Sequence, residues 1–315
     1  MKILIIQQRY GIGDMVIFLP YIHAISKKFN SPVSLLAKES SKAMDILRGD
    51  KHIDKIITLD EEKDGLSGFF KLSKELKKIN FEKVFIFNSS LRYNLIAKLI
   101  GIKSIHQYPL FRSKDNIVHS AKIFTEDALK EKVSMEPKIQ VDNEQVILAK
   151  KKYNITNNEK NICVGLSASG DTKRWSIQKY ISVCEKINKK MSCRFFLAGG
   201  KNDKIFINQF MNSTLQKNCI SFENLTVSEA IPLIKNCDFY FGNDTGWLHL
   251  SAGLNIKSLG LFMDSPVLAY GKYSKNISVI VPEGFTEATT THDTLGKEKI
   301  SVEMVYNKVI KMLTN

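Results

Sequence analysis

Apolar residues along this chain follow two patterns that alternate. Short apolar runs, typical of buried strands, occur at residues 2–6, 33–37, 55–59, 83–87 and 103–107. Between these runs, apolar residues recur at helical spacing over residues 14–29, 39–48, 68–79 and 90–100. Strands alternating with helices predict a parallel sheet with crossover helices, and the ligands of such sheets bind beyond the carboxyl ends of the strands.

The same alternation begins again after a polar stretch at residues 150–160. Further strands are predicted at residues 161–166, 194–198, 218–222, 238–241 and 257–262, and the chain closes on a helical pattern at 302–313. A chain of 315 residues with 43% hydrophobic residues can bury two sizeable cores. We therefore expect two doubly wound α/β domains, residues 1–150 and 151–315.

The junction at residues 239–253 is the most informative stretch. An apolar strand runs into Asp244-Thr245-Gly246 and directly into a helical pattern that carries His249. Unpaired backbone N–H groups and the helix dipole attract anions to such a start, so these residues indicate a phosphate or sugar-phosphate site. An ordinary capped helix with a satisfied histidine is the alternative.

A second strand-to-helix junction lies near the start of the chain. The loop from Gln7 to Gly13 follows the first strand, and Asp14 places a carboxylate in the first turn of the next helix. Val16 stands where a dinucleotide fingerprint has its third glycine, and no Walker lysine follows a Gly-x-x-x-x-Gly pattern. The loop is thus a candidate ligand-binding loop, but neither a dinucleotide-binding loop nor a P-loop.

Three further strand-end loops carry candidate chemistry. Residues 167–175 bring hydroxyls, among them Ser169, together with Lys173, a combination that suits a diphosphate; a surface loop with chance cations is the alternative. Asp203 could accept both ribose hydroxyls or cap a helix. Leu225 precedes another helix and is placed to line a base pocket.

Charge and composition narrow the setting. The formal net charge is +14, and it divides equally between residues 1–150 and 151–315. No nucleic-acid motif is present. Two explanations of the positive charge remain: a generally lysine-rich composition, or binding to an anionic inner leaflet that carries a phosphorylated lipid acceptor. No apolar run is long enough to span a membrane and no signal-cleavage pattern is present, so we expect a cytoplasmic, peripherally bound protein. The five cysteines lack metal-site spacing and are expected to be buried thiols.

Taken in order, these motifs resemble glycosyltransferase family 9, the ADP-heptose:lipopolysaccharide heptosyltransferases and their relatives. The similarity runs from residue 2 to about 310 and rests on four motifs, at residues 11–20, 173–175, 199–200 and 243–252. It implies a GT-B architecture with a cleft between an acceptor domain and a nucleotide-sugar domain, and a last helix that packs back on the first domain. Where many relatives continue Gly-Pro-Thr after residue 262, this chain has Met263-Asp264-Ser265-Pro266.

The resemblance also implies roles for individual residues. Lys173 and Ser169 match positions that contact the donor phosphates. Gly13, Asp203, Leu225 and the residues Asp244, Thr245, Gly246 and His249 complete the expected donor site. Four basic residues in the first domain are candidates for gripping acceptor phosphates: Arg92, Arg112, Lys114 and Lys122. The last three lie in an irregular segment, residues 107–132, for which a solvated surface excursion is the alternative.

The resulting hypothesis is inverting heptosyl transfer from ADP-heptose to a lipopolysaccharide core or related glycan, by a monomer without a cofactor. Asp14 is the expected base, and Lys173 with the helix start at Gly246 stabilises the leaving diphosphate, so no metal is required. A different nucleotide sugar or acceptor, such as capsule or a glycoprotein, is the main alternative. A silent nucleotide-sugar-binding protein and a nicotinamide-dependent oxidoreductase are the rivals; the missing third glycine argues against the latter.

Overall fold

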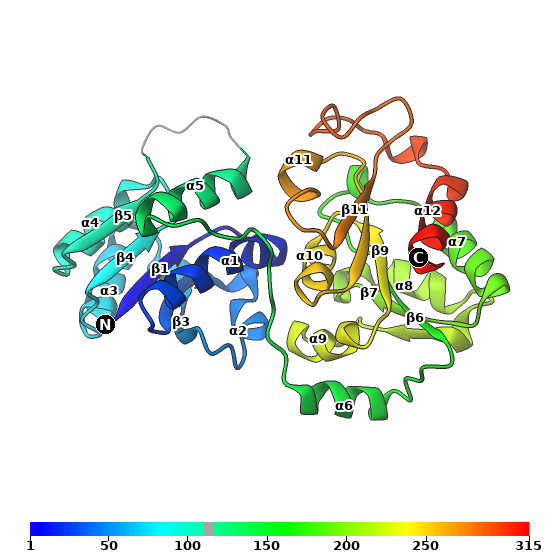
Figure 1. Ribbon diagram of the computed structural model, residues 1–315, viewed down its shortest axis with the longest axis horizontal. Helices are drawn as coiled ribbons and strands as arrows, with labels where there is room; N and C mark the ends of the chain where they lie inside the picture. The colour runs from blue at the N-terminus through cyan, green and yellow to red at the C-terminus, as the bar shows by residue number, and fades with distance from the viewer. Residues whose placement is uncertain (110–115, 315) are drawn as a thin grey trace. The chain divides into compact units, whose positions relative to one another are not determined.

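The computed structural model describes residues 1–109 and 116–314, and these form two compact units, Met1–Gln140 and Val141–Asn315. Each unit is an α/β layer structure built on its own parallel sheet, coloured blue to green in the first and green to red in the second (Figure 1). None of the helices in these described residues is long and apolar enough to cross a membrane.

The first unit holds a five-stranded sheet in the order β3-β2-β1-β4-β5, with every pair parallel. Its strands are β1 (Ile3–Gln7), β2 (Val33–Lys38), β3 (Ile53–Leu59), β4 (Lys83–Ile86) and β5 (Ser104–Gln107). Its helices are α1 (Ile12–Lys28), α2 (Ala43–Ile46), α3 (Gly65–Lys77), α4 (Leu91–Leu99) and α5 (Ile117–Leu129). α1 contacts α5, and α3 contacts α4.

The second unit has six parallel strands in the order β11-β10-β9-β6-β7-β8. The strands are β6 (Lys160–Gly165), β7 (Cys193–Ala198), β8 (Cys219–Ser221), β9 (Phe239–Asn243), β10 (Lys257–Leu261) and β11 (Ile277–Ile280). The helices are α6 (Asn143–Lys152), α7 (Ile177–Lys190), α8 (Lys204–Met211), α9 (Val227–Lys235), α10 (Gly246–Gly253), α11 (Val267–Tyr270) and α12 (Val302–Thr314). Both orders are those of doubly wound nucleotide-binding folds.

The strand order of each unit fixes where a ligand can bind. In the first unit the order reverses between β1 and β4, and in the second between β6 and β9. At such a switch point the connections leave in opposite directions and open a crevice beyond the carboxyl ends of the strands. The loops after these four strands are therefore the expected positions of ligand-binding and catalytic residues.

Most elements agree with the apolar pattern, and the departures have local causes. The single helix predicted at residues 39–48 is a 3₁₀ turn followed by the short α2, because Lys42 between them adopts a left-handed backbone, with φ 53°. Residues 117–129 of the segment expected to be irregular form α5. β11 was not predicted. α12 contacts α7 within the second unit, and packing of this helix on the first domain stays a prediction.

A buried polar cluster supports the amino edge of the first sheet. The Asp50 carboxylate lies 2.8 Å from Nε2 of His23 and accepts bonds of 2.9 Å from the backbone N–H of His52 and from the Gln140 amide. Burial acts to raise the pKa of Asp50, but the bond and charge of His23 outweigh it and lower that pKa. Burial, with the charge of His23, also lowers the pKa of His52.

This cluster predicts that the first unit loses stability in acid. A histidine with a depressed pKa in the folded state binds its proton more readily when unfolded, so stability falls as the pH drops below about 6.5. The lowered pKa of Asp50 adds a further loss as that carboxylate is protonated, well below pH 5. Urea unfolding at pH 7.5 and 5.5 should show the first loss, and His52→Gln should reduce the difference between the two pH values.

Asp50→Ala is the matching structural test. Removing Asp50 leaves the buried His23 ring and the half-buried Gln140 amide without their acceptor, and breaking a buried pair in this way typically costs about 3 kcal/mol or more of unfolding free energy. An unchanged urea midpoint at pH 7.5, or wild-type stability that does not depend on pH between 5.5 and 7.5, would contradict this account of the cluster.

Candidate functional site

The candidate donor site begins at a buried amide. Asn243, the last residue of β9, is fully buried. Its Oδ1 accepts bonds from the Trp175 N–H at 3.1 Å and the Tyr180 hydroxyl at 2.9 Å. Its Nδ2 donates to the carbonyls of Leu166 at 3.2 Å and Ser167 at 3.1 Å. One side chain thus joins the end of β9 to both ends of the loop that follows β6.

The two strands meet at this point without side chains between them. Gly165 of β6 lies opposite Gly242 of β9, and a Cβ added to Gly242 would stand 2.5 Å from the Gly165 Cα. Glycine is needed at Gly242 because of this close approach, and at Gly165 because a Cβ there would stand 1.9 Å from the Tyr240 hydroxyl. The loops after β6 and β9 are held next to each other as a result.

The expected donor residues lie in a row along the carboxyl edge of this sheet. Leu225 follows β8, Asp203 follows β7, Ser169 and Lys173 follow β6, and Asp244 follows β9. In the sheet these strands occur in the order β8-β7-β6-β9. Neighbouring strands are about 4.8 Å apart, so the row spans about 14 Å.

The loop after β6 exposes its hydroxyl and leaves its lysine half-buried. Ser169 and Gly170 are exposed, and a 3₁₀ turn at Asp171–Lys173 follows them. Burial acts to raise the pKa of Asp264, but a bond from the Thr172 hydroxyl, the Leu295 N–H and the charge of Lys173 lower it. Lys173 therefore lies near the Asp264 carboxylate, which follows β10 and contacts the loop after β6 through Thr172.

Asp244 and His249 lie close together at the start of α10, and each has a hydroxyl partner of its own. The Asp244 carboxylate accepts a 2.6 Å bond from the Ser265 hydroxyl and lies 3.6 Å from Nε2 of His249. Nδ1 of His249 lies 2.8 Å from the Tyr273 hydroxyl, and the histidine is buried. Thr245 is the N-cap residue and Gly246 the first residue of α10, so unpaired N–H groups face the same edge.

Asp203 has internal partners for both carboxylate oxygens. Oδ2 accepts bonds from the Ser167 hydroxyl at 2.6 Å and the Gly200 N–H at 3.0 Å, and Oδ1 pairs with the Arg174 guanidinium at 3.1 Å. That guanidinium also donates to the Leu166 carbonyl and stacks over Phe206. In this structure Asp203 caps its own turn and braces the loop after β6; a ribose contact stays a prediction.

In the first unit the carboxylate of Asp14 sits at the switch point. Gly11 is the N-cap residue of α1, and Gly13 and Asp14 lie in its first turn. The Asp14 carboxylate pairs with Nε of Arg9 at 2.8 Å and accepts a 3.3 Å bond from the Gly11 N–H. Its side chain keeps 18% of its surface exposed, so it remains accessible from solvent.

Beside this loop lies a buried donor that sequence reasoning missed. Gln7 ends β1 and is fully buried, its Oε1 accepts from the Arg9 N–H, and its Nε2 has no hydrogen-bond partner among residues 1–109 and 116–314. Burying an unpaired amide is costly, which marks a place where a ligand or water would bond. The sequence does carry one sign of this residue: Gln7 is a polar residue that ends an apolar strand, and the same is true of Asn243.

The candidate acceptor cations are placed differently from one another. Arg92 donates to the carbonyls of Lys63 and Gly65, so it braces the start of α3. Lys122 lies on α5, 3.9 Å from Glu126. Arg112 and Lys114 fall outside the described residues.

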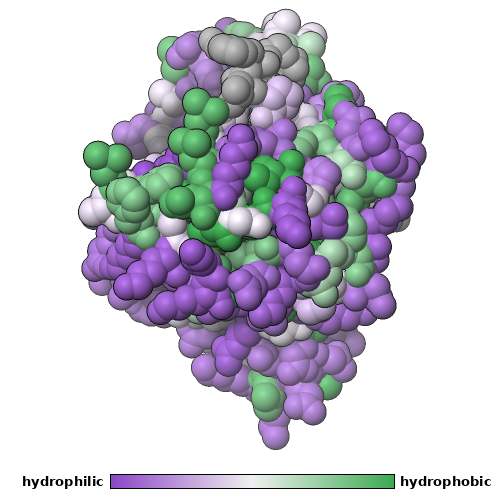
Figure 2. Space-filling model, turned by 90° about the vertical axis from the view of Figure 1, so that its left-hand side faces the viewer, coloured by the Kyte–Doolittle hydropathy of each residue, from purple (hydrophilic) through white to green (hydrophobic). Residues whose placement is uncertain are grey.

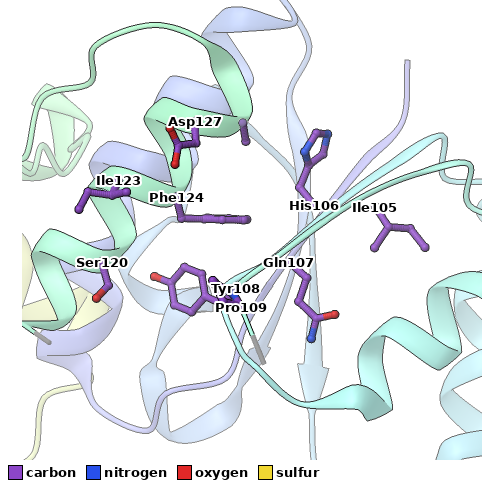
Figure 3. Close-up of a pocket in the computed structure, with 10 residues that line it drawn as sticks. Ile105, His106, Gln107, Tyr108, Pro109, Ser120, Ile123, Phe124 and Asp127 are labelled. Atoms are coloured by element: carbon purple, nitrogen blue, oxygen red, sulfur yellow. The ribbon is translucent and has the colours of Figure 1, made fainter. Parts of the chain in front are cut away.

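A cavity of about 530 Å³ opens at the carboxyl end of β5. Figure 3 shows Phe124 of α5 above the ring of Tyr108, with Asp127 further along the same helix and His106 on the strand. The rings of Tyr108 and Phe124 meet edge to face at 4.9 Å. Its size and its mostly apolar lining are those of small-ligand sites.

Two units of nucleotide-binding topology, with candidate chemistry at the switch point of each, are the architecture of the GT-B fold class. Residues 69–299 match the family model described as glycosyltransferase family 9 (heptosyltransferase). The chain therefore belongs to glycosyltransferase family 9 and is a glycosyltransferase.

Individual relatives extend over nearly the whole chain. It is 24% identical to lipopolysaccharide heptosyltransferase 1 of Campylobacter coli, over 93% of this chain and 92% of the relative. The fold matches the ADP-heptose lipopolysaccharide heptosyltransferase II of E. coli with a TM-score of 0.78 at 19% identity, covering 100% and 99% of the two chains. A family 9 glycosyltransferase from Veillonella parvula matches with a TM-score of 0.80 at 15% identity, covering 99% and 97%.

The Asn243 amide yields a direct test of how the donor site is held. Asn243→Ala removes both bonds to the Leu166 and Ser167 carbonyls and both acceptor bonds, leaving buried groups unpaired. We expect a loss of about 3 kcal/mol in the unfolding free energy of the second unit, and weaker nucleotide binding because the loop after β6 loses its anchor.

Thermal and urea unfolding, with calorimetric titration of ADP, measure both effects. Asn224→Ala, at an exposed position after β8, is the control and should stay within about 0.5 kcal/mol of wild type. An Asn243→Ala protein as stable as that control would show that the four bonds do not hold the site.

Proposed function

We propose that this protein transfers a heptose from ADP-heptose to a hydroxyl of a lipopolysaccharide core glycan, with inversion. The order of the loops along the carboxyl edge of the second sheet carries the proposal. Leu225, Asp203, Lys173 and Asp244 follow β8, β7, β6 and β9, neighbours in that order. This order suits base, ribose, diphosphate and sugar in turn, and about 14 Å is a span that an extended nucleotide sugar can cover.

The leaving group is stabilised in the second unit. As the bond from the sugar to the diphosphate breaks, its electron pair moves to the β-phosphate oxygen of ADP. Lys173 follows β6 and α10 begins just after β9, so the lysine and the free N–H groups of that helix start belong to the edge where we propose that this charge develops. Fixed donors and a cation aimed at developing charge lower the barrier without reorganisation during the reaction.

The proton is accepted in the first unit. The acceptor oxygen bonds to the anomeric carbon and passes its proton to the Asp14 carboxylate, which is already oriented by Arg9 and the Gly11 N–H. A carboxylate accepts this proton late, once the oxygen is bonding to an oxocarbenium-like carbon.

The acceptor is proposed to lie along the carboxyl edge of the first sheet. β1, β4 and β5 are neighbours there, so the Asp14 loop, Ser90 and the cavity at Tyr108 share one edge. Lys122 is proposed to contact acceptor phosphates, in competition with Glu126. A phosphorylated glycolipid acceptor places this reaction at the inner face of the cytoplasmic membrane.

A different nucleotide sugar is the second candidate, and one observation favours it. Met263-Asp264-Ser265-Pro266 replaces the Gly-Pro-Thr of many relatives, and Asp264 and Ser265 lie beside Lys173 and Asp244. These positions adjoin the place proposed for the sugar. A changed sugar pocket would alter the donor while leaving the base and the leaving-group site as they are.

Asp14→Asn tests the proposed base. With ADP-heptose and a deacylated core acceptor, wild type should form heptosylated product detected by mass spectrometry. The variant should be slower by a factor of about 100 or more, since a positioned base typically contributes that much. Its affinity for ADP should be unchanged.

Asp45→Asn, in the first turn of α2, is the matched control and should keep wild-type turnover. Near-normal transfer by Asp14→Asn would remove the base from the proposal. Turnover with UDP-, GDP- or other ADP-sugars but none with ADP-heptose would establish the second candidate instead.

Lys173→Ala tests the leaving-group site. We expect both weaker ADP binding and slower transfer, with a loss of about 1.5 to 3 kcal/mol, as for a hydrogen bond to a charged group. Calorimetric titration and the same transfer assay give the two values. Lys201→Ala, an exposed lysine in the neighbouring loop, should change each by far less; equal effects of the two substitutions would mean that only the general positive charge matters.

A further inference from the structure

The outer face of α3 and α4 exposes more apolar surface than a solvated helix pair needs. On α4, Leu91, Leu95 and Leu99 recur every fourth residue and are 58%, 53% and 56% exposed. On α3, Leu66 and Phe70 are 82% and 63% exposed. Figure 2 shows apolar residues gathered on this side of the molecule among hydrophilic ones.

These exposed residues form one surface, which we name the α3/α4 face. The two helices contact each other, and Arg92 of α4 binds the carbonyls of Lys63 and Gly65 at the start of α3. The opposite sides of both helices supply Leu72, Leu76, Tyr93, Ile96 and Ala97 to a buried core with the sheet. α4 is therefore apolar on its buried side and again on its exposed side, which is typical of a helix that meets a second apolar surface.

The charges around this face are mostly basic. Five exposed lysines lie on or beside the two helices, and none is in an ion pair within the described part of the chain: Lys74, Lys77, Lys78, Lys98 and Lys103. α4 carries no acidic residue, Glu75 of α3 is paired with Lys63, and the exposed acidic residues nearby, Glu61, Glu62 and Asp64, are confined to the turn before α3. Leucines beside unpaired lysines fit an interface that is anionic at its surface and apolar below.

We propose that the α3/α4 face docks on an anionic lipid bilayer, with the α4 leucines entering the headgroup region and the five lysines meeting the lipid charges. A second copy of this chain fits less well, because a two-fold contact would bring two faces that both carry these lysines together. α3 and α4 both begin at the carboxyl edge that carries Asp14. The proposal rests on the proposed function in one respect, which is that the acceptor is anchored in such a bilayer.

Vesicle sedimentation with the full-length protein tests the proposal. One set of vesicles contains phosphatidylglycerol and phosphatidylcholine, and the other phosphatidylcholine alone. Wild type should bind the anionic vesicles, and part of the binding should persist at 0.5 M salt, where the Debye length is only about 4 Å. The variant Leu91→Ser/Leu95→Ser/Leu99→Ser should bind at least about tenfold more weakly and lose the salt-resistant part.

Matched substitutions separate apolar contact from charge. Ile205→Ser changes a 70% exposed apolar residue on α8 of the other unit and should bind like wild type. Lys98→Gln/Lys103→Gln should weaken binding at low salt and leave the salt-resistant part. Circular dichroism and thermal unfolding of each variant confirm that α4 still forms.

Each outcome decides the question. A triple leucine variant that binds like wild type, or wild type that binds no anionic vesicles, overturns the proposal. Wild type that dimerises in solution through these leucines, seen by sedimentation velocity with and without the triple substitution, also overturns it. Vesicle binding as expected without sugar transfer would refute the proposed function alone, whereas transfer to a deacylated acceptor without vesicle binding would refute the docking alone.

Discussion

The candidate donor site depends on one buried amide. Asn243 satisfies all four of its hydrogen-bonding positions, two through carbonyls at the end of β6 and two through groups before and within α7. The close contact of Gly165 with Gly242 allows the strands to come near enough for these bonds. Because every position is satisfied in a fully buried setting, a shift of either loop would leave a buried group unpaired, which holds the loops after β6 and β9 in one arrangement.

The carboxylate of Asp14 is held in a contrasting way. Its ion pair with Arg9 is partly exposed, with 41% of the arginine side chain accessible, so water weakens the attraction and little energy is lost when the pair exchanges partners. A base must release one partner and accept a proton from another during each turnover. A rigid donor loop and an exchangeable carboxylate are therefore suited to binding a charged leaving group and to moving a proton, respectively.

The sequence predicted the architecture well, because its signals are local. Ten apolar runs correspond to β1–β10, and the Asp-Thr-Gly junction marks the start of α10. β11 escaped notice, as did the division of residues 39–46 at Lys42, which depends on a single backbone angle. The family likewise follows from four motifs in order.

Side-chain partners were beyond the reach of the sequence, because they come from distant positions. Asp203 was assigned to ribose from its place after a strand, yet its oxygens bond Ser167 and Arg174, 36 and 29 residues away. Arg92 was expected to contact the acceptor; its guanidinium binds carbonyls 27 and 29 residues away, and a contact with the acceptor stays a prediction. Residue type and strand position locate a site in such folds, and tertiary packing decides which polar groups within it remain available.

The exposed side of α4 shows the same limit for apolar residues. Its leucines at every fourth position carry a helical period, and sequence alone cannot separate them from Ile96 and Ala97, which are buried. For the lysines of α3 the sequence by itself favours an ordinary solvated helix face. The net charge divides equally between the two parts of the chain and so favours no surface. The structure distinguishes one face because unpaired lysines and exposed leucines occur there together, and neither feature by itself would separate a lipid surface from ordinary solvent.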